Sequence, residues 1–310
     1  MSKTKATVSN VKRRFSNKQL MLISAVLTSI IIFGLVLSFI LLQKPNKFSL
    51  NAAIIDQIGE KFPSNSTMAQ EFNETSVSIL EQAGFSVTYH RYETVKVNFF
   101  KELAKRDYGI IILRAHYAKR DSETEVDIFT SEEYRDGVYD YVSKGNYTWE
   151  PGKFYFAITP DFIKHLDGVF PKSIIIAMGC WSLKPGYEEM ADAFIQKGAT
   201  AYIGWTEEVD ISHSDKETVR LLRMLLEEKM SIADAVGNVV PDWTFPPGSR
   251  MTFYPHTDII GNLKISDLIE ETKASSNLQG MIASFTLAPA LCMTFTGLKR
   301  KILDLACQPL

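Results

Sequence analysis

Three short apolar runs constrain the fold of this chain more than any other feature of its sequence. They are AAIIDQI at residues 52–58, YGIIILRA at 108–115 and SIIIAM at 173–178. Strands that are apolar at nearly every position are buried on both faces, which is typical of parallel sheets covered by helices. The chain between these runs is therefore expected to supply helices that cover the sheet.

Segments with helical periodicity separate the apolar runs. Residues 71–84 place Phe72, Ile79 and Leu80 on one helical face and end at Gly84, a natural helix stop. Other helices are expected at 97–105, 160–166, 187–197, 215–229 and 232–239, and other strands at 85–92 and 199–205. The sequence thus predicts an α/β domain over residues 52–277, with a mostly parallel sheet and helices on both faces.

Two parts of this domain have weaker patterns. The polar segment from 119 to 150 predicts only a short strand at 126–130 and a loop, and a further strand is expected at 153–158. Residues 250–265 predict one more pair of strands.

A long apolar segment precedes the domain. Residues 19–43 contain no charged side chain, and a helix of this length, at about 1.5 Å per residue, spans a hydrocarbon core about 30 Å thick. Residues 1–18 carry six Lys or Arg side chains and no acid, so the positive-inside rule places them in the cytoplasm. We predict a membrane protein with a signal anchor at 19–43, a linker at 44–51 and the main domain outside the cytoplasm. A cleaved signal peptide remains the alternative.

A second uncharged segment lies near the other end of the chain. Residues 278–298 precede a basic tail at 299–310 and fit either a second membrane span or a buried segment, because they include Pro289 and several Ser and Thr residues. Sequons at Asn65, Asn73 and Asn146 agree with an extracytoplasmic domain.

Composition argues against several classes of function. The net charge of −2 gives no basic field for nucleic acid. Three cysteines without a Cys-x-x-Cys pair indicate neither a disulfide framework nor structural zinc, and no cofactor is expected. Asp210, His213 and Asp215 are metal-ligand residue types, but Ser212, Ser214 or Asp215 as a helix N-cap explains the pattern better. Nothing in the sequence indicates the oligomeric state.

Two residues suited to nucleophilic catalysis follow two of the apolar runs. His116 comes directly after residues 108–115, and Cys180 comes after 173–178 and Gly179. Ligands of open parallel sheets bind at the carboxyl ends of the strands, so neighbouring strands would place both side chains in one crevice. A thiol there is a nucleophile that an imidazole can activate. The alternative is a structural Cys180, because small buried cysteines are common at strand ends.

Three stretches resemble the caspase-like cysteine peptidases, which include caspases, gingipains, separases and CHAT domains. They are GIIILRAHY, SIIIAMGCWS and MADAFIQKGATAYIGWTEEVD, within residues 52–265, and the pattern is most similar to gingipain and CHAT domains. The resemblance implies a caspase-like three-layer sandwich, a protein or peptide substrate and a Cys–His dyad. His116 would be the general acid and base, and Cys180 the nucleophile.

The resemblance also indicates which residues would surround the dyad. Backbone N–H groups of Tyr117 and Cys180 would form the oxyanion hole, although many members have Gly in place of Tyr117, whose bulk is expected to narrow the cleft. Asp56, Trp205 and Glu207 would line the substrate pocket, where acids favour a Lys or Arg side chain. Glu207 as part of a solvated loop, and Trp205 as a cap on the core, are the alternatives.

Three hypotheses therefore describe the function. The first is a membrane-anchored, externally facing cysteine peptidase, and the second is a catalytically silent domain of the same fold that binds a partner at the membrane. The third is an unrelated doubly wound binding domain in which Cys180 is structural.

Overall fold

The structure, a computed structural model, describes residues 28–29, 31–33, 47–59, 66–120, 124–148 and 150–277. The chain divides into two units, Met1–Pro45 and Asn46–Leu310, and the described residues of the first unit are helical. Across the described ranges, no helix combines the length and the apolar character needed to cross a bilayer. Apart from 28–29 and 31–33, the predicted anchor at 19–43 lies outside the described residues, as do 1–18, 278–298 and 299–310.

The second unit is a mixed α/β domain built on a six-stranded sheet. In spatial order its strands are β10 (Met251–Tyr254), β9 (Ala201–Trp205), β8 (Ile174–Ala177), β3 (Ile110–Arg114), β1 (Asn51–Asp56) and β2 (Ser86–His90). Every neighbouring pair is parallel except β9 and β10, which are antiparallel. The three apolar runs supply β1, β3 and β8, so the predicted mostly parallel sheet is confirmed.

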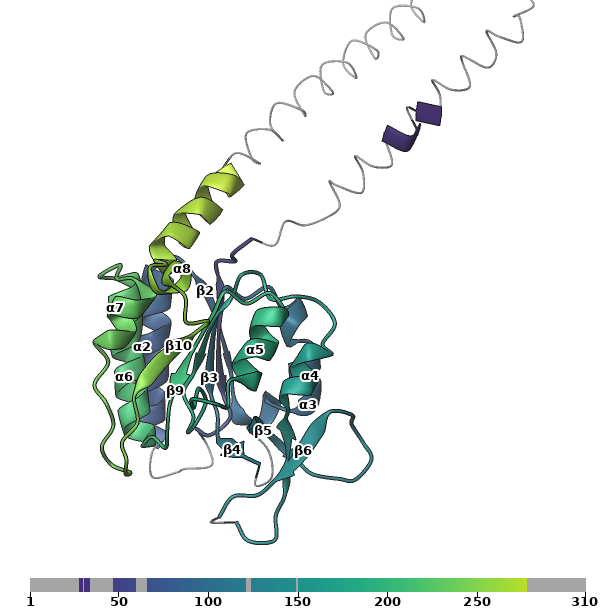
Figure 1. The fold of residues 1–310 in the computed structure, drawn as a ribbon, viewed down its shortest axis with the longest axis vertical. Coiled ribbons are helices and arrows are strands. Elements are labelled where there is room, and N and C mark those ends of the chain that lie inside the picture. Colours follow the sequence, from purple (N-terminus) through teal and green to yellow (C-terminus); the bar gives the residue numbers. More distant parts are fainter. Residues whose placement is uncertain are drawn as a thin grey trace, which may run out of the picture. The chain divides into compact units, whose positions relative to one another are not determined.

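Helices cover both faces of this sheet (Figure 1). One face packs on α2 (Ser66–Gln82), α6 (Ile211–Leu226) and α7 (Ile232–Gly237), and the other on α3 (Val97–Lys101), α4 (Pro160–Lys164) and α5 (Glu189–Gln196). Successive strand residues point to opposite faces. Ile54 and Ile112 accordingly belong to the first core and Ile55 and Leu113 to the second, which explains why these strands are apolar throughout.

A second, antiparallel sheet extends from the end of β3. Its strands are, in order, β4 (Tyr117–Lys119), β5 (Val126–Glu133), β7 (Tyr155–Ile158) and β6 (Val142–Gly145). The prediction of a loop after residue 130 is wrong in part, because β6 forms there from the polar sequence VSKG, which is half-buried at the sheet edge.

The end of the domain also differs from the prediction. Instead of a strand pair over 250–265, the chain forms only β10 and then α8 (Asp258–Gly261), and residues 265–277 are helical. Helix α6 begins four residues before the predicted start at 215, because Asp210 caps it. Short 3-10 turns, η2 (Tyr92–Thr94) and η3 (Leu103–Lys105), flank α3.

Candidate active site

The carboxyl ends of β3 and β8 bring His116 and Cys180 to one cavity. The two strands are parallel neighbours in which Leu113 pairs with Ala177, and each candidate residue lies three positions beyond its member of that pair. Both line a cavity of about 240 Å³. The structure therefore places the two candidate residues in the same cavity.

Backbone contacts fix the turn that carries Cys180. Met178 N–H donates to the carbonyl of Leu113 at 3.0 Å, and Trp181 N–H donates to the carbonyl of Glu207 at 3.0 Å. Trp181 has a φ of 56°, a left-handed conformation that costs free energy in a non-glycine residue and often occurs beside functional groups. The chain thus turns sharply directly after the thiol.

Gly179 is required by close packing. A Cβ atom there would lie 2.1 Å from the ring of Tyr117 and 2.5 Å from the carbonyl oxygen of Ala115. The bulk of Tyr117 is therefore packed against the back of the Gly179 turn, wholly buried in the core. The expectation that this side chain narrows the cleft is wrong, because Tyr117 is not among the residues that line the cavity.

The backbone N–H of Tyr117 is not used in the β4–β5 ladder. Tyr117 lies opposite Ile128 in the β4–β5 ladder, and Phe129 N–H donates to the carbonyl of His116 at 2.9 Å. Since hydrogen-bonded and non-hydrogen-bonded pairs alternate in antiparallel ladders, the N–H of Tyr117 points away from β5.

His116 connects the two sheets and is held by residues of both. Its backbone N–H donates to Oε1 of Gln57 at 3.0 Å. Its ring contacts those of Phe129 and Tyr147 at centroid distances of 4.7 and 5.1 Å. Gln57 is wholly buried and also donates to the carbonyl of Thr130. Gln57 was not among the predicted site residues, although a polar residue directly after a buried strand was a usable signal.

Burial shifts both members of the pair toward their neutral forms. It lowers the pKa of His116 to about 4. Burial also raises the pKa of the Cys180 thiol, and the negative charge of Glu208 raises it further. The backbone N–H of Val209, 3.5 Å from the sulfur, partly offsets this rise. Near pH 7 the site therefore holds a thiol and an unprotonated imidazole.

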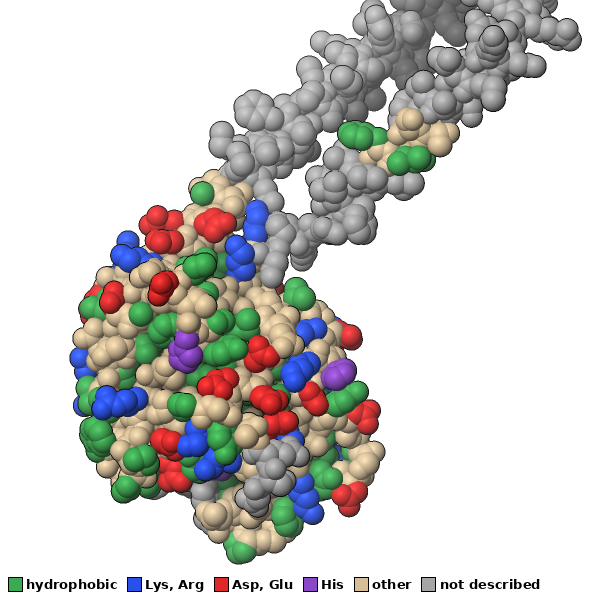
Figure 2. Space-filling view, viewed as in Figure 1, with side chains coloured by type: hydrophobic (Ala, Val, Ile, Leu, Met, Phe, Trp, Pro, Cys, Tyr) green, Lys and Arg blue, Asp and Glu red, His purple; other side chains and the backbone are tan. Residues whose placement is uncertain are grey.

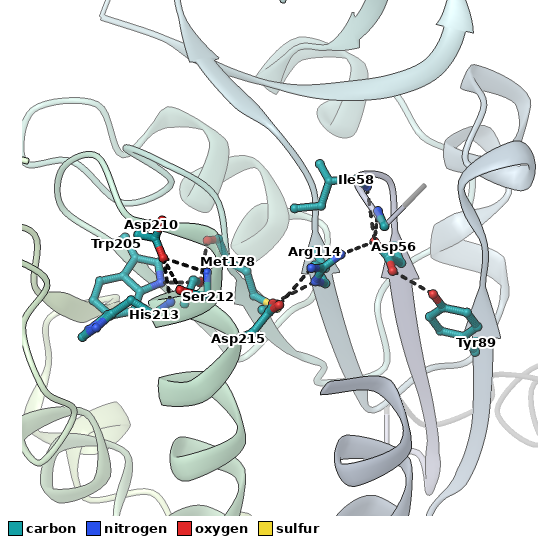
Figure 3. A network of polar contacts seen from close by, with 12 residues as sticks. Asp56, Ile58, Tyr89, Arg114, Met178, Trp205, Asp210, Ser212, His213 and Asp215 are labelled. Carbon is teal, nitrogen blue, oxygen red and sulfur yellow. Dashed lines mark hydrogen bonds and ion pairs between the residues drawn. The ribbon is translucent and has the colours of Figure 1, made fainter. Parts of the chain in front are cut away.

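A buried ion-pair cluster contributes Arg114 and Asp215 to the lining of the cavity (Figure 3). Arg114 donates from Nε and Nη2 to the two carboxylate oxygens of Asp215 and from Nη1 to Asp56, each at 2.8 Å. Asp56 also accepts from the hydroxyl of Tyr89 at 2.7 Å. Burial opposes the charge of Arg114, but the two carboxylates outweigh it and raise its pKa. Both carboxylate oxygens of Asp56 thus accept hydrogen bonds from side chains of the protein.

The other predicted pocket residues are also engaged by neighbouring side chains. Trp205 is wholly buried in the core, and its Nε1–H donates to Oγ of Ser214 at 3.0 Å. Glu207 forms an ion pair with Lys184. The residues that line the cavity include neither of these side chains nor Asp56.

The segment with metal-ligand residue types forms a helix cap, but the capping residue is Asp210 and not Ser212, Ser214 or Asp215 as predicted. Oδ1 of Asp210 accepts from the N–H groups of Ser212 at 2.9 Å and His213 at 3.2 Å, at the start of α6. In the described part of the chain, no group of three His, Cys, Asp or Glu residues is arranged to hold a metal ion.

Acidic and basic side chains are interspersed over the face of the molecule in Figure 2. This face offers no gathering of basic side chains of the kind that a nucleic-acid backbone requires. No protein-family model matches the chain, and a search of the curated proteins finds no match.

Proposed function

We propose that this protein is a caspase-like cysteine peptidase that hydrolyses peptide bonds through Cys180 and His116. One observation carries the proposal: both side chains line a single cavity at the carboxyl ends of adjacent parallel strands. Parallel sheets concentrate reactive groups at this edge, and a nucleophile beside a base is the arrangement that acyl transfer needs.

The architecture supports the resemblance on which the family assignment rests. Helices, a mostly parallel sheet and helices form three layers, with the His strand and the Cys strand adjacent. With the predicted anchor at 19–43, the enzyme would act at a membrane, with the domain outside the cytoplasm.

The chemistry begins from the neutral pair. As Sγ of Cys180 attacks the substrate carbonyl carbon, its proton passes to the imidazole of His116, and a C–S bond forms. The N–H groups of Tyr117 and Cys180 stabilise the resulting oxyanion. The C–N bond then breaks, and the leaving amine takes the proton from His116. Water then attacks the thioester carbon and gives one proton to His116. The C–S bond breaks to release the acid, and His116 returns the proton to Sγ of Cys180.

A second candidate is a catalytically silent domain that binds a peptide in the same cavity. The surroundings of the sulfur favour this second candidate. Sγ of Cys180 donates to the carbonyl oxygen of Val209 at 3.6 Å, and the pKa of the thiol is raised. A thiol held in this way is less reactive than a thiolate.

Alkylation and hydrolysis of the full-length protein distinguish the two candidates. The peptidase hypothesis predicts that iodoacetamide modifies Cys180 at neutral pH and that peptide reporters are cleaved. Cys180→Ala should abolish cleavage, and His116→Ala should lower it by about 10²–10⁴-fold. His165→Ala, at an exposed histidine directly after α4, is the matched control and should leave cleavage unchanged. Alkylation without cleavage of any reporter would favour the silent domain.

A further inference from the structure

The cavity beside the proposed dyad has an apolar wall. Six of its lining residues are apolar: Ile58, Ala115, Met178, Val209, Ile211 and Phe245. They come from the ends of β1, β3 and β8, from the segment around the start of α6 and, for Phe245, from the loop between α7 and β10. We infer that this cavity is a subsite for an uncharged apolar side chain of the substrate, at the residue whose carbonyl Cys180 attacks. The inference rests on the proposed function.

Arg114 and Asp215, which line the cavity with opposite charges, are paired with each other. Arg114 and Asp215 form two hydrogen bonds of 2.8 Å, and each side chain is less than a tenth exposed. The remaining Nη1 contact of Arg114 goes to Asp56. An acidic substrate side chain therefore finds no uncommitted guanidinium, and a basic one finds no uncommitted carboxylate at this depth. A charge entering without a partner loses its hydration without compensation.

Two further acids border the cavity, and neither outweighs its apolar wall. Asp210 uses its carboxylate to cap α6. Glu208 lies near Cys180 and is only partly buried, so water screens its charge. Its negative charge repels an acidic side chain, and a basic one would lose its hydration on entering the apolar space. Apolar burial is thus the larger favourable contribution to binding here.

Phe245 is the side chain through which this preference can be tested. It lies in a loop closed by reciprocal hydrogen bonds between Asp242 and Ser249, at 2.9 and 2.7 Å, so its position is defined. Phe245 is 38% exposed, and its truncation therefore removes cavity wall without opening the main core.

The experiment compares reporters that differ only at the residue before the scissile bond. The full-length protein is given Leu, Met, Arg, Lys and Asp reporters, together with peptide chloromethyl ketones that carry the same residues and alkylate Cys180 without turnover. We expect kcat/KM and alkylation rate to be at least about tenfold higher for Leu or Met than for the charged residues. Phe245→Ala should reduce this ratio, whereas Val169→Ala, at an exposed apolar residue outside the cavity, should not.

The possible outcomes separate this inference from the proposed function. Fastest cleavage of Arg or Lys reporters, reduced by Glu208→Gln, would overturn the apolar subsite and leave the peptidase proposal standing. Equal rates for all residues would also overturn it. Preferential alkylation by the Leu reagent with no cleavage of any reporter would support the subsite and refute the peptidase. If Cys180 reacts with no reagent, both proposals fail.

Discussion

Replacing Arg114 tests the buried ion-pair cluster that it forms with Asp56 and Asp215. Arg114→Met keeps an unbranched side chain in place and removes all three 2.8 Å hydrogen bonds to Asp56 and Asp215. The Arg114 and Asp56 side chains are 1% exposed and that of Asp215 is 7% exposed, so solvent cannot replace the lost partner. Removing one member of a buried ion pair costs about 3–5 kcal/mol.

This loss should be measurable as a lower unfolding temperature. For a domain of this size, 1 kcal/mol corresponds to about 2–4 °C, so Arg114→Met should lower Tm by roughly 6–20 °C. Circular dichroism of the full-length protein at pH 7 measures this shift. Arg135→Met is the matched control: Arg135 is 70% exposed and 3.6 Å from Glu132, and exposed pairs contribute about 0–1 kcal/mol.

The variant should also depend on pH in a defined direction. Burial already raises the pKa of Asp215, and loss of Arg114 raises it further. The ionised carboxylate then destabilises the fold above this folded-state pKa, and the penalty diminishes as pH falls through it toward the unfolded value of about 3.9. The difference in Tm from the wild type should therefore be smaller at pH 5 than at pH 7. An Arg114→Met protein no less stable than Arg135→Met would refute the reasoning.

Three other expectations follow from the site. Gly179→Ala should destabilise the domain by about 1–3 kcal/mol because its Cβ has no space, whereas Gly237→Ala, with nothing within 4 Å, should not; equal unfolding midpoints in denaturant would contradict this. The rate of Cys180 alkylation should keep rising above pH 8.5, about where a free thiol titrates, because burial raises its pKa; a plateau below pH 8 would count against this. Asp210→Ala should cost about 1 kcal/mol through loss of the α6 cap, seen as a lower Tm, and an unchanged Tm would argue against the cap.

The central sheet and the pairing of the two site residues were predictable for one physical reason. Strands buried on both faces must be apolar at successive positions, so β1, β3 and β8 are visible as uninterrupted runs. The same runs end at His116 and Cys180, and parallel strands place their ends at one edge. The positions of His116 and Cys180 at the edge of the sheet could therefore be predicted from the apolar runs that precede them.

Partners distant in sequence were not predictable in this way. Asp56 is a strand-end acid, and nothing near it in sequence shows that Arg114, 58 residues away, neutralises it. Glu207 is similarly engaged by Lys184, 23 residues earlier. The edge strand β6 was missed because half-buried polar residues have no strand signature of their own and are ordered by pairing with β7.

The order of strands in the main sheet has a consequence for synthesis of the protein. From β3 onward, each strand of this sheet pairs with the one made before it, so β8, β9 and β10 each find an existing edge. Between β3 and β8, however, the ribosome must make roughly 60 residues, which takes about 3–12 s. During that interval the apolar edge of β3 lacks its partner, and unpaired edges of this kind invite pairing with other chains. Variants that delay the arrival of β8 should therefore be lost to aggregation during expression, even when the finished fold is stable.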